Sequence, residues 1–199
     1  FELRDARRLC RELGVELAVV ELDIFQVEEA VKNPADRCYY CKRALFGALK
    51  ERAVEDGFGL LLDGTNASDD ADDRPGMRAA RELSVRSPLR ECGMTKMEVR
   101  EASRKAGLFT WDKPAYACLA TRILTGEEIT GGKLKQIELG EDALFRMGFS
   151  DFRIRLFHGA ARLQLPAGQM ETALARRKEI SASLEAEGFE GILLDLKER

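Results

Sequence analysis

Two of the five cysteines stand three positions apart, in the sequence Cys38-Tyr39-Tyr40-Cys41. If a helix begins here, both thiols lie on one face near its N-terminus, where the helix dipole lowers a thiol's pKa and favours the thiolate. Thiolates bind metals and perform redox chemistry, although no thioredoxin-like pattern surrounds this pair. Taken alone, the spacing indicates metal or redox use as readily as two packed cysteines.

A third cysteine, Cys118, follows a stretch with a proline and aromatic residues (residues 111–116). Lys113 and Arg122 are cations that can favour its thiolate form. The alternative, slightly favoured by the local sequence, is a small core residue beside Ala117. Three thiols used together would leave the fourth position of a metal site open, as catalytic sites do and closed structural zinc sites do not.

Polar residues follow a short apolar run at residues 59–62, in the sequence Asp63-Gly64-Thr65-Asn66. If the run is a strand of a parallel sheet, these residues lie at its carboxyl end, where such sheets bind ligands. A polar turn is the simpler interpretation. An acidic stretch at residues 69–73 then leads into Arg74-Pro75-Gly76, and residues 86–90 add two arginines in a loop constrained by Pro88.

Arginines alternate with apolar residues in Arg153-Ile154-Arg155-Leu156. In a strand, both guanidinium groups would point to one face, and paired arginines suit a phosphate or carboxylate ligand. A solvated strand face explains the pattern equally well. Glu141, on the preceding predicted helix, can balance these charges or bind a metal, and the single histidine, His158, has no partner motif.

The elements that must position these residues change in character along the chain. Up to about residue 110, helical and strand patterns alternate, which predicts an α/β layer fold with a parallel sheet. Its apolar strand at residues 59–62 would be buried on both faces. The expected elements are a helix over residues 3–13, a strand over 15–22, a helix after Cys38, the strand at 59–62, and a helix from Thr95 to about 106, opened by a capping box.

After residue 126 the order of elements differs. The pattern predicts a helix (133–147), two strands (152–157 and 161–165), a helix (169–186) and a strand (190–196). An α-β-β-α-β order suits a small α+β domain with some antiparallel pairing. We therefore place a domain boundary near residue 126, which gives domains of residues 1–125 and 126–199.

The composition of the 199 residues, 45% hydrophobic and 34% charged, is that of a soluble globular protein and excludes disorder and collagen-like repeats. No apolar run approaches the ~18 residues of a membrane span. A net charge of −3 provides no general attraction to nucleic acid. Five cysteines without a secretory signal favour the reducing cytoplasm. Because the chain begins at Phe1, inside a predicted helix, we expect a further segment to precede it.

Several of these motifs in series resemble the LarE family. They are residues 33–42, Asp63-Gly64-Thr65-Asn66, Arg74-Pro75-Gly76, Arg86-Ser87-Pro88-Leu89 and residues 111–122, which occur in the family's order with similar spacing. LarE proteins are ATP-dependent sulfur transferases of the PP-loop pyrophosphatase superfamily. The resemblance implies that residues 1–125 are the remainder of a PP-loop α/β domain and that residues 126–199 are the small α+β domain.

The resemblance also implies a reaction. LarE proteins use ATP, with Mg²⁺, to adenylate a carboxylate of pyridinium-3,5-biscarboxylic acid mononucleotide, and sulfur then displaces AMP. A second round completes a precursor of the nickel-pincer nucleotide cofactor of lactate racemase. We therefore expect ATP and an anionic pyridinium mononucleotide as ligands, no nucleic acid or membrane partner, a homo-oligomer, and a cytoplasmic location.

Residue roles follow by similarity. Cys38, Cys41 and Cys118 would hold a [4Fe–4S] cluster with an extra sulfide as the sulfur donor; in other members, the residue that matches Cys118 gives up its own sulfur. Arg153 and Arg155 match arginines that hold the substrate phosphate. The remaining implied site residues are Asp63, Gly64, Thr65, Asn66, Arg74 and Arg122 in ligand binding, and Cys118 and Glu141 in catalysis.

The S-G-G-x-D-S loop that binds pyrophosphate in PP-loop enzymes does not occur in these 199 residues. Its usual place is upstream of Phe1, and we expect it there. Two alternatives remain open. The first is another PP-loop thiolation enzyme, acting on tRNA or a small molecule, although such enzymes often carry extra C-x-x-C zinc pairs or a basic surface. The second is a metal-binding module without catalytic activity.

Overall fold

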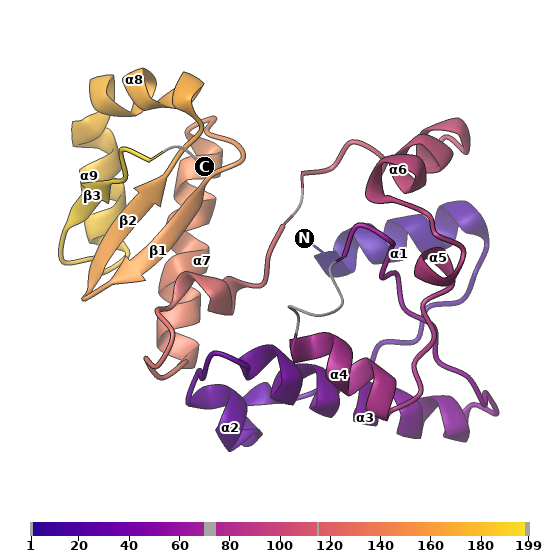
Figure 1. Ribbon diagram of the computed structural model, residues 1–199. Helices are drawn as coiled ribbons and strands as arrows, with labels where there is room; N and C mark the ends of the chain where they lie inside the picture. Colours follow the sequence, from indigo (N-terminus) through magenta and orange to yellow (C-terminus); the bar gives the residue numbers. More distant parts are fainter. Residues whose placement is uncertain (1, 70–74, 115, 198–199) are drawn as a thin grey trace. The chain divides into compact units, whose positions relative to one another are not determined.

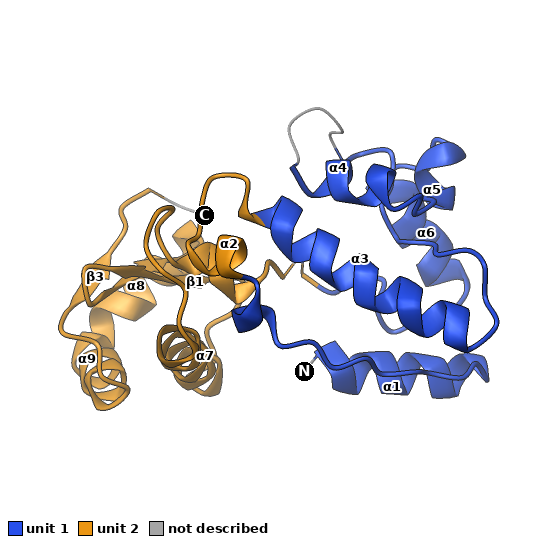
Figure 2. Cartoon of the chain, turned by 90° about the horizontal axis from the view of Figure 1, so that it is seen from below, with its two compact units in different colours: residues 1–27, 38–113 blue, residues 28–37, 114–199 orange. Residues whose placement is uncertain are grey.

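The computed structural model describes residues 2–69, 75–114 and 116–197, and it combines helices with a small sheet (Figure 1). The chain divides into two compact units, which Figure 2 colours separately: residues 1–27 with 38–113, and residues 28–37 with 114–199. The mixed α and β class predicted from the sequence is confirmed. The domain boundary near residue 126 stays a prediction.

Helices make up most of the first unit. They are α1 (Glu2–Leu13), the 3₁₀ helix η1 (Ile24–Gln26), α3 (Arg37–Glu55), α4 (Pro75–Glu82), α5 (Pro88–Glu91) and α6 (Lys96–Lys105). The predicted capping box opens α6: the backbone N–H of Glu98 donates to the Thr95 hydroxyl, and the backbone N–H of Thr95 donates to the Glu98 carboxylate. The helices predicted over residues 3–13 and after Cys38 are also confirmed.

The two strands predicted in this unit are largely not formed. Residues 15–22 have no strand structure, so that prediction was wrong. In the segment 59–62, the described residues form a single isolated parallel bridge, between Leu62 and Arg86. Leu60 and Leu62 are 54% and 58% exposed rather than buried on both faces. A buried strand needs neighbouring strands that pair with both of its edges and helices that cover both of its faces. A single bridge to Arg86 does not amount to such pairing.

The second unit contains the sheet. Its elements are α2 (Glu28–Val31), the 3₁₀ helix η2 (Leu119–Arg122), α7 (Gly131–Arg146), β1 (Arg153–Phe157), β2 (Ala160–Gln164), α8 (Ala167–Ala175), α9 (Arg177–Ala186) and β3 (Ile192–Leu194). The order in the sheet is β1-β2-β3, with β2 antiparallel to β1 and parallel to β3. The predicted order is confirmed except that two helices stand where one was predicted, and the expected antiparallel pairing joins β1 and β2.

One predicted helix, over residues 169–186, is instead two helices that meet at Arg176. The backbone of Arg176 leaves the helical conformation, with φ −96° and ψ 15°. Its guanidinium group donates to the carbonyl oxygen of Met147 at 2.6 Å and forms an ion pair with Glu179 at 2.8 Å. These contacts tie the break to the C-terminal end of α7, which a pattern of apolar residues does not reveal.

Alternation in β1 and β2 builds the core of this unit. Ile154 and Leu156 of β1 are buried together with Ala161 and Leu163 of β2. Helices α7 and α9 lie on this face of the sheet (Figures 1 and 2). Their buried residues, Ile137 and Leu144 on α7 and Ile180 and Leu184 on α9, complete the cluster. Because the apolar residues must face the helices, the arginines between them point to the opposite face of the sheet.

Gly140 on α7 makes the close packing possible. A Cβ atom at this position would lie 2.9 Å from Phe189 Cε2 and 3.1 Å from Ile154 Cδ1. We expect Gly140→Ala to destabilise the unit by about 1–2 kcal/mol, because overpacking outweighs the better helix propensity of alanine. Gly132→Ala in the same helix is the control, because its Cβ would meet only Thr130 Oγ1, at 3.9 Å. A urea midpoint for Gly140→Ala at or above the wild-type value would contradict this packing.

Candidate functional site

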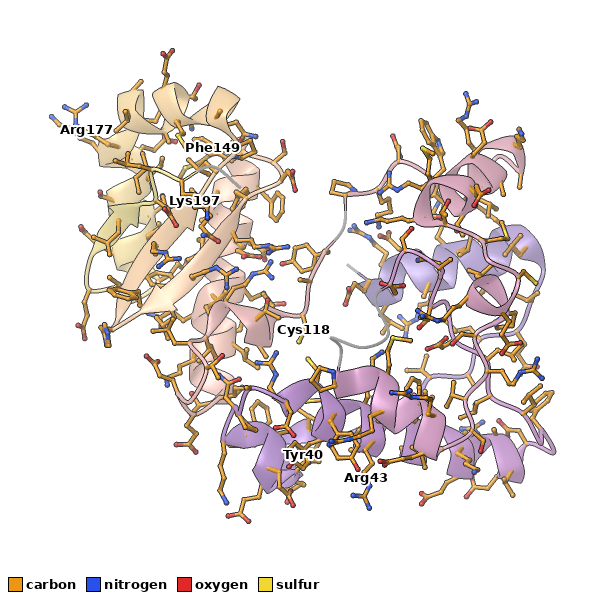
Figure 3. All side chains as sticks on the ribbon, viewed as in Figure 1. Tyr40, Arg43, Cys118, Phe149, Arg177 and Lys197 are labelled. Atoms are coloured by element: carbon orange, nitrogen blue, oxygen red, sulfur yellow. The ribbon has the colours of Figure 1, made fainter. Side chains whose placement is uncertain are left out.

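Cys118 lies at the start of η2 with an exposed side chain (Figure 3). Both backbone carbonyl groups that flank it are hydrogen-bonded. Arg122 Nη1 donates to the Ala117 oxygen at 3.0 Å, and the Thr121 hydroxyl donates to the Cys118 oxygen at 2.8 Å. The thiol is therefore presented on a fixed loop. This arrangement is suited to a nucleophile or a metal ligand and contradicts the packed core residue that the local sequence slightly favoured.

A buried ion pair holds the loop that carries Cys118, the cysteine loop, in place. Arg122 Nε lies 2.9 Å from Glu141 Oε1, and both side chains are only 1% exposed. The carboxylate of Glu141 also accepts hydrogen bonds from the Ile154 backbone N–H, at 3.1 Å, and from the Tyr116 hydroxyl. One carboxylate thus joins the cysteine loop, α7 and β1.

Tyr116 is a functional residue that the sequence reasoning did not single out. Burial, together with the hydrogen bond to Glu141 and the charge of that carboxylate, raises the pKa of Tyr116 well above its usual range. Its hydroxyl therefore keeps its proton and remains a donor to Glu141. The roles assigned to Glu141 in catalysis and to Arg122 in ligand binding stay predictions. The charged groups of both side chains are buried against each other.

Asn33 and Arg37, which precede the C-x-x-C and belong to the second unit, donate hydrogen bonds to the same loop. Asn33 is buried with φ +53°, a left-handed conformation that asparagine tolerates. Its side-chain amide donates to the Leu124 oxygen at 2.7 Å, while Arg37 Nη1 donates to the Ala120 oxygen at 3.1 Å and also to Asn33 Oδ1. Both residues belong to the motif at residues 33–42 that resembles the LarE family. The sequence reasoning assigned a function only to the cysteines of that motif.

The arginines of β1 lie on one face of the strand, as predicted. Arg153 and Arg155 alternate with the buried Ile154 and Leu156. Arg155 Nη1 donates to the Thr121 oxygen at 2.7 Å, so the strand is bound directly to the cysteine loop. Whether these arginines bind a ligand stays a prediction.

The C-x-x-C occupies the first turns of α3, as predicted, with Cys38 exposed and Cys41 half-buried. These two cysteines belong to the first unit and Cys118 belongs to the second. In the described residues, no group of three metal-ligating side chains is assembled. The three-cysteine metal site therefore stays a prediction.

A hollow of about 360 Å³ in the first unit brings the predicted polar loop against two helices. It is lined by Lys42 and Phe46 of α3, by Asp63, Gly64, Thr65 and Asp69, and by Met77 of α4. Lys42 is a cation that the sequence reasoning did not assign. A Cβ at Gly76 would lie 2.7 Å from Lys42 Cδ, so the glycine leaves room for this side chain.

Asp63 is the most strongly hydrogen-bonded residue of the hollow. Its carboxylate accepts bonds from the Ser87 hydroxyl, at 2.6 Å, and from the backbone N–H and hydroxyl of Thr65, at 3.1 and 2.7 Å. Burial alone would raise its pKa, but these bonds together lower the pKa of Asp63 below its usual value. Asn66 forms the next turn by accepting from the Ser68 N–H. Arg74 lies outside the described residues.

The hollow and the cysteine loop each have a clear chemical character. The first combines a carboxylate that stays ionised with a lysine, as a site for a cation-bound phosphate compound does. The second presents a thiol on a loop that is bound to an arginine-bearing strand. An enzyme that brings sulfur to an anionic ligand needs both features.

Known proteins resemble this chain over most of its length, although no family model matches it. It is 30% identical, over 195 residues, to the pyridinium-3,5-bisthiocarboxylic acid mononucleotide synthase of Lactiplantibacillus plantarum, covering 98% of this chain and 71% of that protein. An uncharacterized protein of Synechocystis sp. is 36% identical over 198 residues, which are 98% of this chain and 74% of the relative. An uncharacterized protein of Methanocaldococcus jannaschii is 26% identical over 178 residues, with coverages of 89% and 69%.

The chain therefore belongs to the LarE family, as its motifs predicted. It is an enzyme of the sulfur transferase class. In the part of the chain that the structure describes, no helix has both the length and the apolar character needed to cross a bilayer.

The buried ion pair yields a stability prediction. We expect Glu141→Gln to destabilise the second unit by about 3 kcal/mol, because it leaves the Arg122 guanidinium buried without its counter-charge. The double variant Arg122→Met, Glu141→Leu should lose less than this single change. Glu138→Gln, which removes an exposed partner of Lys135, is the control and should change stability by under ~0.5 kcal/mol. Urea unfolding measures all three, and equal losses for Glu141→Gln and Glu138→Gln would refute the role of the pair.

A second prediction concerns the pKa of Asp63. Because the folded-state pKa is lowered, this carboxylate stabilises the fold above its unfolded-state pKa, and the contribution disappears as the pH falls through the lowered value. In Ser87→Ala, the pKa of Asp63 should rise and the acid-unfolding midpoint should move to higher pH. Ser103→Ala, whose hydroxyl donates only to the Val99 oxygen, is the matched control. NMR titration of the Asp63 carboxyl carbon would show an unchanged pKa if Ser87 had no such effect.

Proposed function

We propose that this enzyme catalyses ATP-dependent sulfur transfer to pyridinium-3,5-biscarboxylic acid mononucleotide, in the biosynthesis of the nickel-pincer nucleotide cofactor of lactate racemase. The observation that carries the proposal is the exposed Cys118 thiol on a loop that Arg122 and Arg155 fix in place. The name of the Lactiplantibacillus plantarum relative supports the choice of substrate.

The first half-reaction activates the substrate. A carboxylate resists nucleophiles, so its oxygen first attacks the α-phosphorus of ATP, which forms an acyl adenylate and releases pyrophosphate. The first unit, as part of a PP-loop domain, would bind ATP. Asp63 would bind Mg²⁺ through its carboxylate, and Gly64, Thr65, Asn66 and Arg74 would complete the nucleotide site. Lys42, which also lines the hollow, would neutralise phosphate charge.

The second half-reaction transfers sulfur. A sulfide sulfur attacks the acyl carbon, the bond to the adenylate oxygen breaks, and AMP leaves with the electron pair of that bond, which gives the thiocarboxylate. If the Cys118 thiolate attacked instead, the product would be a thioester, and loss of the Cα proton with cleavage of the Cβ–S bond would release the thiocarboxylate and leave dehydroalanine. Arg153 and Arg155 would hold the phosphate of the mononucleotide, and this fixes the carboxyl group in attack geometry. Glu141 and Arg122 would act mainly by keeping the Cys118 loop in position, since their charged groups are buried against each other.

Cys38, Cys41 and Cys118 would hold a [4Fe–4S] cluster. Three thiols, two of them in a C-x-x-C at the start of a helix, are the ligands that iron–sulfur clusters take. In the described residues none of the three forms a disulfide, and Cys38 and Cys118 are exposed, which fits this group. When bound, the cluster would supply a renewable sulfur atom for the transfer. A homo-oligomeric, cytoplasmic enzyme is part of the same proposal.

The proposal is tested on the protein with its complete natural chain, purified without oxygen. With ATP and the biscarboxylic mononucleotide, we expect pyrophosphate release and a product in which sulfur replaces a carboxyl oxygen. Cys118→Ala should still release pyrophosphate but form almost no thiocarboxylate, and it should lose most of its four irons per chain. Cys92→Ala, another exposed cysteine, is the matched control and should behave as wild type.

Three results would contradict parts of the proposal. Absence of pyrophosphate release in the wild type would reject the adenylating enzyme and favour a metal-binding module. Stoichiometric zinc in place of iron would reject the cluster. Thiocarboxylate formation by Cys118→Ala at the wild-type rate would reject the cysteine as donor or ligand.

A further inference from the structure

A third arginine lies on the face of the sheet that carries Arg153 and Arg155. Arg162 stands on β2, and the antiparallel register pairs it directly with Arg155 of β1. Its neighbours Ala161 and Leu163 are buried in the core, so Arg162 points to the other face, as Arg155 does. Side chains that face each other across such a pair have Cβ atoms only about 5 Å apart. The fold thus brings together two guanidinium groups that are seven positions apart in the sequence.

The contacts of Arg162 leave it available to a ligand. Its side chain is 36% exposed and forms an ion pair with Asp195, whose Oδ2 lies 3.3 Å from Arg162 Nε. That Nε is buried, yet within the described part of the chain it has no hydrogen-bond acceptor in good geometry. A buried donor without an acceptor loses free energy, and a charged one loses more. A ligand oxygen would offset that loss.

The register places the side chains of Arg155 and Arg162 directly opposite each other. Like charges that lie directly opposite each other on a sheet repel and destabilise it. Arg155 donates to the side-chain oxygen of Gln164 at 2.7 Å and to the Thr121 oxygen at 2.7 Å. These bonds orient the Arg155 guanidinium on the face that it shares with Arg162. A doubly charged anion between Arg155 and Arg162 would turn the repulsion into attraction to a shared partner.

We propose that Arg162 is a third ligand-binding arginine, which contacts the phosphate of the pyridinium mononucleotide together with Arg153 and Arg155. This inference rests on the proposed function, because it concerns the same substrate. A phosphate monoester has three terminal oxygens, and each can accept from a different guanidinium group. Arginines from two adjacent strands can contact the phosphate from two sides, which the neighbouring pair on β1 cannot do alone.

Asp195 positions the side chains around Arg162. Its Oδ2 also accepts from the Gln164 side-chain amide at 3.0 Å, and its Oδ1 accepts from the Lys197 N–H at 3.1 Å. These bonds hold the carboxylate in place when Arg162 turns towards a ligand. Through Gln164, the same carboxylate orients the oxygen that accepts from Arg155. Asp195 is thus a positioning residue that competes with the ligand for Arg162.

The test measures the binding of nicotinamide mononucleotide, a pyridinium mononucleotide, and of nicotinamide riboside, which lacks the phosphate. Calorimetry is done on the protein with its complete natural chain. We expect Arg162→Gln to weaken mononucleotide binding about tenfold, with no change for the riboside, because one charge-assisted hydrogen bond is lost. Arg162→Lys keeps the charge but lacks the planar guanidinium group. Its affinity for the mononucleotide should lie between those of the wild type and Arg162→Gln.

Two controls separate binding from stability. Arg177→Gln removes an arginine at the exposed start of α9, which Figure 3 shows pointing away from the sheet, and it should leave binding unchanged. Asp195→Asn keeps the hydrogen-bond acceptor for Gln164 but removes the charge that competes for Arg162. We expect this variant to bind the mononucleotide more tightly. If Arg162 and Asp195 formed only a structural ion pair, both changes would leave the affinity unaltered or lower it.

Arg155→Gln distinguishes a failure of this inference from a failure of the proposed function. If Arg155→Gln weakens mononucleotide binding but Arg162→Gln does not, Arg162 has no role in binding and the proposed function stands. If the wild type does not distinguish the mononucleotide from the riboside, the phosphate site on this sheet is rejected. In that case, the release of pyrophosphate and the formation of thiocarboxylate decide separately whether the proposed function survives.

Discussion

The second unit depends on one buried ion pair, between Arg122 and Glu141. In a low-dielectric interior, a charge is stable only when its partner and its remaining hydrogen bonds are all in place. Glu141 meets this condition by accepting from Arg122, from Tyr116 and from the Ile154 backbone. Because two of these donors come from the loop and the third from β1, Glu141 fixes both segments against helix α7. The position of the exposed Cys118 thiol therefore depends on this ion pair, because Arg122 also donates to the Ala117 oxygen.

The arginine-bearing face of the sheet follows from the same packing. Ile154 and Leu156 are buried in the core beneath the sheet. Because side chains alternate along a strand, Arg153 and Arg155 point to the opposite face. Arg155 then bonds to the Thr121 oxygen, three residues beyond Cys118. The anion that we propose for this face would thus be coupled to the thiol through a single short segment. A family that transfers sulfur to an anionic substrate needs this coupling, because small errors in attack geometry are costly in rate.

The first unit uses polar contacts rather than a deep core to shape its hollow. Asp63 is held by hydroxyl and backbone donors, and Gly76 leaves the space through which Lys42 passes. The opposite charges of Asp63 and Lys42 in the lining favour a ligand that carries both phosphate groups and a cation.

Much of this protein was determined by the sequence alone. The capping box at Thr95, the alternation in β1 and β2, and the serial motifs of the LarE family are local patterns, and each predicted its element or class correctly. What the sequence did not reveal depends on partners far along the chain. Apolar residues 59–62 form one bridge and no buried strand, because a ladder needs a neighbour that periodicity does not specify. Only the tertiary structure brings Tyr116 to Glu141 and sets Arg162 opposite Arg155, because these contacts depend on how the loop packs on α7 and on the register of β1 and β2.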